Sequence, residues 1–436
     1  MSKFLRCGLV FLSLLVAVFP VQAKQPKGWL YPLYVDRDLW EEHRIEVSAQ
    51  VQAGFLQNDN GSENVFPTGF FSINEGFVLN RITLAVEKPL RTNYIPRVGP
   101  LPKAMPTDWD WGFVLEGRYG EDFSRTYGFD DEMGINEGNR RKLLLPQWFV
   151  KGYAPIGAGT TFQFGTWFTN VGNEIGAPID PPSPFYTHPY AMMYAPSKHF
   201  GGLLSTKLPI SDEYGLWGME LGLVQGWNNV QDNNDEKSLI TSLQWRSKDM
   251  RTWIDFESIW GNEQSEQGIT DQRPFVAVSS NKENLFRQFH SLTLKHSFGE
   301  QRDWQVILNG VYGDQEGGDV AADANNPPGF LITEDSQWHG VNGTVLWKMR
   351  NDLQLGLRAE WFTDKEGAYF LLPGGDYQAW TANASWYPQP WLRVRPELRY
   401  DRYNGDGKPF GGTLPTLFNG SETEQWLFSI DATVFL

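Results

Sequence analysis

Cysteine is almost absent from this chain. Its 436 residues contain one cysteine, Cys7, close to the first residue. We expect the segment around Cys7 to be removed on export, so a disulfide framework, thiol catalysis and a cysteine-ligated metal are excluded for the mature protein. Cys7 also precedes the neighbouring apolar stretch and lacks the motif of a lipid-modified cysteine, which excludes a lipoprotein.

Basic charge is scarce as well. The chain has 37 Lys and Arg against 52 Asp and Glu, a formal net charge of −15. Because a protein that binds phosphates needs a basic surface, nucleic acid is not an expected partner.

Long apolar runs are missing after residue 23. No uninterrupted run approaches the roughly 18 residues of a membrane-spanning helix, and the mean hydropathy is −0.42. A transmembrane barrel alternates lipid-facing and water-facing side chains, so its average hydropathy resembles that of a soluble protein. Aromatic residues make up 15% of the chain, with 19 Trp, and aromatics concentrate at membrane interfaces.

Residues 1–23 have the pattern of a secretory signal peptide. Lys3 and Arg6 precede an apolar core from Leu9 to Phe19, and Val21-Gln-Ala23 forms a small-residue cleavage site. We therefore expect an exported protein with a periplasmic or outer-membrane destination, and the strand pattern described below favours the outer membrane of a Gram-negative bacterium. Residues 24–43 would then form a periplasmic tail or a segment that plugs the lumen.

The final stretch, 426–436, alternates with period two. Trp426, Phe428 and Ile430 share one face of an extended strand, while Ser429 and Asp431 share the other. In an outer-membrane barrel this would be the closing strand, paired with the first so that no edge remains open.

Fifteen further segments have strand character, many about 10 residues long, which is near the length needed to cross a bilayer. Together they predict an all-β, antiparallel transmembrane barrel of about sixteen strands over residues 44–436, with fourteen or eighteen as alternatives. The sixteen segments are 44–56, 77–87, 110–120, 143–153, 160–168, 199–208, 216–227, 238–246, 251–260, 286–297, 303–313, 338–349, 353–363, 377–387, 392–403 and 424–436.

The connections alternate in length. Those after even-numbered strands are mostly short, as in 350–352 and 388–391, and those after odd-numbered strands are long and polar, as in 121–142. Short periplasmic turns and long extracellular loops give this alternation. The exception is Lys88–Trp109, which is long where a short turn is expected; it is either a periplasmic excursion or a missed pair of strands.

The strand 392–401 indicates which face looks inward. Arg393, Arg395 and Arg399 share one parity, and an Arg in the bilayer midplane costs roughly 2–4 kcal/mol, so this face must line the lumen. The same argument applied to the neighbouring alternating strands predicts a wide, water-filled channel with a lining of mixed charge. The predicted pore-lining residues are Glu116, Arg118, Arg358, Glu360, Arg393, Arg395, Glu397, Arg399 and Asp401.

Several motifs in order along the mature chain resemble the outer-membrane β-barrel porins of the OmpL-like group. The resemblance implies an outer-membrane barrel that passes small solutes, and it does not settle which solutes. Thr187-His-Pro189 stands where members of the group tend to have Ser-Arg-Ser, so the role of that arginine is not carried over. The motifs are Gly165–Glu174, Pro184–Tyr190, Ala195–Gly202, Gly222–Asn228, Arg358–Asp364 and Trp391–Asp401.

The third long loop, 169–198, is the candidate constriction. In sixteen-stranded general porins the loop at this position folds into the barrel, and by analogy Glu174 and Asp180 would face lumenal arginines such as Arg393 and produce a transverse field. The alternative is an outer loop lying over the rim. If the loop narrows the pore, reversing the charge of Asp180 and Glu174 should change the ion selectivity.

Enzyme and metal chemistry find little support in the sequence. None of the six His residues falls in a Ser/His/Asp or HExxH arrangement, so no catalytic residue and no cofactor is assigned. Asp232, Asp235 and Glu236 cluster, and Asn404-Gly-Asp-Gly407 looks like part of a calcium loop. Because Arg402 stands where the first Asp of an EF-hand would be, no metal site is assigned.

The sequence therefore predicts a non-enzymatic porin for passive diffusion of small hydrophilic solutes. The alternatives are a substrate-selective channel for sugars or organic acids, and a closed barrel with an enzymatic or structural role. Expected partners are outer-membrane lipid and lipopolysaccharide, small polar solutes, and two further copies of the chain in a homotrimer.

Overall fold

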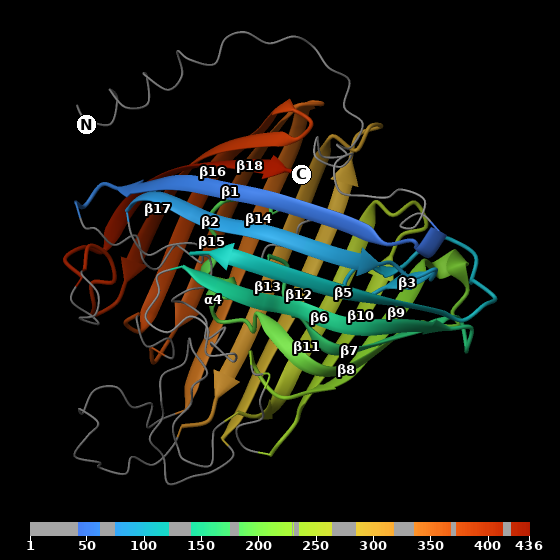
Figure 1. The fold of residues 1–436 in the computed structure, drawn as a ribbon. Helices are drawn as coiled ribbons and strands as arrows, with labels where there is room; N and C mark the ends of the chain where they lie inside the picture. The colour runs from blue at the N-terminus through green and yellow to red at the C-terminus, as the bar shows by residue number, and fades with distance from the viewer. Residues whose placement is uncertain are drawn as a thin grey trace.

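The computed structural model shows a closed antiparallel β-barrel (Figure 1). It describes residues 42–61, 75–121, 141–174, 183–228, 230, 235–263, 285–317, 335–367, 372–412 and 420–436. The predicted signal peptide, most of the segment 24–43, Asp180 and Asp232 lie outside these residues. In the described part of the chain, no helix is long and apolar enough to cross a membrane.

Sixteen strands form the barrel, which confirms the strand count predicted from the sequence. Every predicted segment overlaps one of them, since alternation of apolar and polar side chains is a strong local signal for a half-buried strand. The barrel strands are β1 (Glu46–Asn58), β2 (Gly76–Lys88), β5 (Asp110–Gly120), β6 (Lys142–Ala154), β7 (Thr160–Phe168), β8 (Lys198–Lys207), β9 (Leu216–Val224), β10 (Ser238–Arg246), β11 (Thr252–Asn262), β12 (Phe286–Phe298), β13 (Trp304–Gln315), β14 (Ser336–Arg350), β15 (Leu353–Asp364), β16 (Gly375–Gln389), β17 (Leu392–Asn404) and β18 (Glu424–Phe435).

The first and last strands close the barrel. β1 pairs antiparallel with β18 from Gln50 opposite Phe435 to Asn58 opposite Leu427. Every other barrel strand pairs with its neighbours in sequence, apart from β2, which pairs with β5. Closure gives each strand two partners and leaves no backbone edge in the bilayer.

The two faces of each strand differ sharply. Along β15, Leu357 is 61% exposed on the outer face, while the adjacent Arg358 is 3% exposed inside. Trp380, Tyr400 and Trp426 lie side by side on the outer face, with ring centroids 5.7 and 4.8 Å apart. Such an aromatic row suits a membrane–water interface.

The interior contains an apolar core as well as charges. Ile307 and Val311 interrupt the polar pattern of the inner face of β13, and both are buried. Ile307 belongs to a cluster with Leu346 of β14 and Phe185 of the loop between β7 and β8. These apolar residues of the wall therefore pack against the loop between β7 and β8, which lies inside the barrel.

The long connection Lys88–Trp109 contains no barrel strands, so it is an excursion and not a missed pair of strands, at the end of the barrel predicted to be periplasmic. Within it β3 (Tyr94–Ile95) and β4 (Gly99–Pro100) pair with each other as a separate two-stranded sheet. Figure 1 shows this segment at the end of the barrel where β1 begins.

Candidate functional site

The loop between β7 and β8 enters the barrel. Its described parts are residues 169–174 and 183–197, here called the inner loop, and residues 185–197 are all buried. Of the two positions considered from the sequence, these residues therefore occupy the lumen and not the rim.

The outgoing part of the inner loop crosses from β9 to β15. Asn170 donates a hydrogen bond to Glu220 of β9, and the backbone N–H of Gly172 donates to Glu257 of β11 at 2.7 Å. Glu174 then forms an ion pair with Arg358 of β15, with an N–O distance of 2.7 Å.

Residues 186 and 187, here called the tip of the inner loop, are held by one carboxylate of β17. Glu397 accepts the backbone N–H of Tyr186 at 2.7 Å and that of Thr187 at 2.9 Å, and it also accepts the Thr187 hydroxyl at 2.5 Å. The Tyr186 hydroxyl reaches Asn80 of β2, which donates to it at 2.9 Å. Gly54 of β1 permits this approach, because a Cβ there would lie 2.5 Å from the Tyr186 hydroxyl.

The returning part contains a short helix, α4 (Tyr190–Met193). Glu360 of β15 accepts the backbone N–H of Tyr190 at 2.8 Å, and the Tyr190 hydroxyl donates to Asp401 of β17 at 2.8 Å. The ring of Tyr194 packs against Phe362, with centroids 4.6 Å apart. Apolar packing and charge-assisted hydrogen bonds together hold this half of the loop to the wall.

The arginines of β17 are neutralised by carboxylates of the wall itself. Arg395 pairs with Asp431 of β18 at 2.7 Å, Arg393 lies 3.8 Å from the same carboxylate, and Arg399 pairs with Asp401 at 2.8 Å. Arg395 also donates to the carbonyl oxygen of Ser183 at 2.6 Å. These arginine side chains connect the wall to the loop and are almost completely buried.

A second charged pair lies on β5. Arg118 and Glu116 form an ion pair, and Glu116 also accepts a hydrogen bond from Gln147 of β6 at 2.8 Å. The guanidinium of Arg118 lies 4.7 Å from the ring centroid of Phe168. This pair therefore faces the start of the inner loop.

Burial changes the protonation properties of the inner loop. Desolvation raises the pKa of Glu174, and the neighbouring Arg358 opposes that rise by favouring the carboxylate. Desolvation also holds the pKa of His188 well below its usual value, and the positive charge of Arg358 lowers it further. His188 is therefore neutral at neutral pH.

All nine residues predicted as pore-lining point into the barrel and are buried. The structure brings Arg358, Glu360, Glu397 and Asp401 together around the inner loop, whereas Glu116 and Arg118 form a separate pair on β5. Their role as pore lining stays a prediction. Glu174 pairs with Arg358, a partner that the sequence argument did not select.

Sequence reasoning missed three carboxylates. Asp431 has the inward parity of the closing strand, and that signal could have identified it. Glu220 and Glu257 also have inward parity, on β9 and β11, but only the path of the loop shows that they hold it.

A closed sixteen-stranded barrel with an apolar outer face, a polar inner face and a loop inside defines an outer-membrane porin. The chain belongs to the family described as "Putative beta-barrel porin-2, OmpL-like", whose match covers residues 44–436. This family and fold are those of a channel rather than an enzyme. A comparison with curated proteins finds no match.

Several solved structures share the fold. OprB of Pseudomonas putida at high pH has a TM-score of 0.53 and 9% identity, covering 96% of this chain and 100% of its own. OmpF of Salmonella typhi with daunomycin has a TM-score of 0.52 and 12% identity, covering 90% and 97%. An anion-selective porin from Comamonas acidovorans has a TM-score of 0.51 and 9% identity, covering 90% and 99%. At such identities the likeness concerns the fold alone.

Proposed function

We propose that the inner loop sets the size and charge limit for passive diffusion of small hydrophilic solutes through this porin. The observation that carries the proposal is the path of the loop across the lumen. It contacts Glu220 on one wall, Arg358 on the facing wall and Asn80 near the barrel closure. A solute must pass beside this segment, among the charged residues predicted to line the route.

The remaining predictions concern setting and partners. Export by a cleaved signal peptide, a Gram-negative source, contact with lipopolysaccharide, passage of ions, a homotrimer and the lack of catalytic activity stay predictions. The apolar outer face supports contact with membrane lipid, because exposed Leu and Trp side chains are stable there.

Liposome swelling with a series of neutral sugars and charged organic acids tests the proposed function. A general porin gives rates that fall smoothly with solute size. One steep preference at low concentration would favour the substrate-selective alternative. No swelling together with no single-channel current would contradict the proposal and favour a closed barrel.

Glu174→Gln should shift ion selectivity toward anions. A unit charge about 6 Å from a passing ion contributes about 0.7 kcal/mol in water, which is about a threefold change in the permeability ratio. The reversal potential in a KCl gradient across a planar bilayer measures this change. Arg358→Gln should shift it in the opposite direction, and an unchanged reversal potential in both variants would contradict a role of the pair in filtering.

A further inference from the structure

The periplasmic connection between β2 and β5 places a second segment inside the barrel. Its hairpin, residues 94–100, is here called the periplasmic hairpin. Tyr94 is fully buried; its hydroxyl donates to Gln244 of β10 at 2.6 Å and lies 3.3 Å from Glu220 of β9. Because Gln244 and Glu220 belong to the inner face, the hairpin occupies lumen that a short turn would leave open.

Close contacts with β10 hold the periplasmic hairpin in place. Arg246 of β10 donates to the carbonyl oxygen of Val98 at 2.9 Å. Gly99 has a φ of +88°, and a Cβ there would lie 2.7 Å from Gln244, so only glycine fits this approach.

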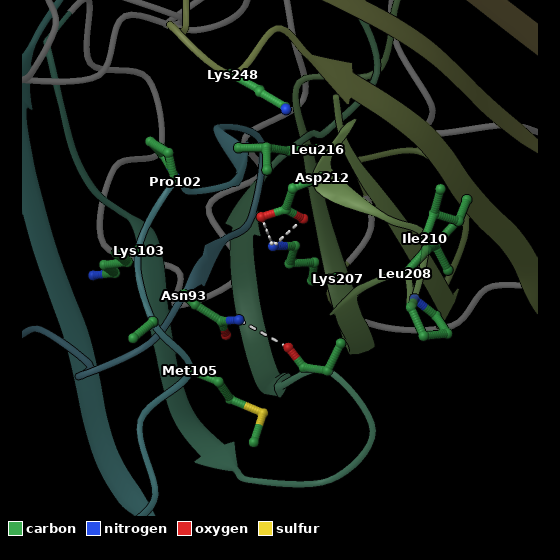
Figure 2. A pocket seen from close by; sticks show the side chains of 13 residues that line it. Asn93, Pro102, Lys103, Met105, Lys207, Leu208, Ile210, Asp212, Leu216 and Lys248 are labelled. Atoms are coloured by element: carbon green, nitrogen blue, oxygen red, sulfur yellow. Dashed lines mark hydrogen bonds and ion pairs between the residues drawn. The ribbon is translucent and has the colours of Figure 1, made fainter. Parts of the chain in front are cut away.

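The rest of the connection covers the periplasmic turns. Figure 2 shows Asn93 donating to the carbonyl oxygen of Ala158, at 2.8 Å. A cavity of about 610 Å³ lies between residues 102–105 of the connection and the turn that contains Asp212. Lys103 lines this cavity from the connection, outside the contacts of the periplasmic hairpin.

The tip of the periplasmic hairpin brings a positive charge to an acidic part of the wall. Glu220 of β9 accepts the backbone N–H of Arg97 at 2.9 Å, and the Arg97 guanidinium is attracted by Glu220 and Glu257. Asp255 lies beside them, paired with Arg246 at 2.7 Å. The hairpin thus adds a cation to a group of inner-face carboxylates that Lys295 of β12 also neighbours.

Arg97 as a residue is partly exposed, while the surrounding protein desolvates its guanidinium. Desolvation lowers the pKa of Arg97 to about 10, so the group stays charged at neutral pH.

We propose that the periplasmic hairpin narrows the lumen together with the inner loop, since both segments bind Glu220, and that Arg97 limits cation passage there. This inference rests on the proposed function, because it requires a conducting barrel. Without the arginine, Lys295 and Arg246 would be the remaining cations near Glu220, Asp255 and Glu257, so this part of the wall would attract passing cations more strongly. The residue therefore contributes to ion selectivity from a segment other than the inner loop, at a carboxylate that both segments bind.

Arg97→Gln tests the proposal in planar bilayers with a KCl gradient. We expect a higher potassium conductance and a shift of the potassium-to-chloride permeability ratio of about threefold toward cations, from the loss of a unit charge beside the path. Lys103→Gln is the matched control, since it removes the same charge from the same connection and should change neither quantity. Equal behaviour of the two variants would overturn the proposal.

Cysteine labelling gives an independent measurement if Arg97→Gln folds poorly. The mature chain is expected to contain no cysteine, so Arg97→Cys introduces a single thiol, and wild-type protein controls for residual labelling. A cationic methanethiosulfonate added from the periplasmic side should restore the wild-type permeability ratio, and an anionic one should shift the ratio further toward cations. A thiol that reacts with neither reagent while the channel conducts would overturn the inference. A wild-type channel without current would instead contradict the proposed function.

Discussion

Glu397→Ala is expected to release the tip of the inner loop and to open the channel. The carboxylate accepts two buried backbone N–H groups, from Tyr186 and Thr187. Hydrogen bonds to a charged group contribute about 1.5–3 kcal/mol each, so the docked tip should lose about 3–6 kcal/mol. Alanine also leaves both donors without an acceptor in the closed position, which favours departure of the tip from the wall.

Single-channel recording measures this effect. The variant should show a larger mean conductance and additional open levels, because the remaining contacts of the loop permit partial release. Glu424→Ala is a suitable control, since Glu424 is a half-exposed carboxylate of β18 that pairs with Arg402 outside the lumen. If both variants conduct like the wild type, Glu397 does not hold the constriction.

Asp431→Asn should destabilise the folded barrel by about 3–5 kcal/mol. That range is typical when one partner of a buried ion pair is removed and the other charge stays buried. Asp431 serves two buried arginines, Arg395 at 2.7 Å and Arg393 at 3.8 Å, and also accepts from Gln52 at 3.0 Å. Asparagine keeps the shape of the side chain but removes the charge that both guanidinium groups need.

Denaturant unfolding in lipid vesicles, followed by tryptophan fluorescence, measures the free energy of unfolding. The control is Asp352→Asn, which breaks an ion pair with Arg350 at the surface, where both side chains are exposed. Exposed pairs contribute at most about 1 kcal/mol. A loss for Asp431→Asn no larger than that of the control would show that the lumenal arginines do not depend on this carboxylate.

The alternation of side chains predicted the barrel strands well because its cause is local. Each residue of β17 and β18 faces either lipid or the interior, so the two parities carry different side chains over the whole strand. The prediction of which side chains face a polar interior was incomplete where the inner loop covers side chains of the barrel wall. Ile307 disturbs the polar face of β13 because Phe185 covers it, and no local pattern reports that contact.

The candidate site was harder to predict than the strands. Parity identified Arg358 and Glu397 as inward-facing, but it could not identify their partners. Tyr190 and Asp401 form a hydrogen bond although 211 residues separate them in the chain. Such a pair depends on the route of the loop through space, which the sequence of the loop does not specify by itself.

The periplasmic connection shows the same difference between what the sequence predicts and what only the structure reveals. Its length made Lys88–Trp109 an exception to the alternation of connections, and the sequence left its meaning open. Only the folded chain shows that Tyr94 is buried beside Gln244 and that Arg97 lies near Glu220. The sequence therefore indicated that this segment is unusual without indicating what it contacts.

The sequence by itself determined an antiparallel barrel of about sixteen strands, the approximate position of each strand and the inward or outward parity along most of them. A bilayer imposes one uniform rule on every residue of a crossing strand, and that rule can be read locally. The tertiary structure alone decided which charges meet and which segments fill the interior. Those contacts join residues distant in the chain, and they form only when a loop and a wall match in shape and charge at the same place.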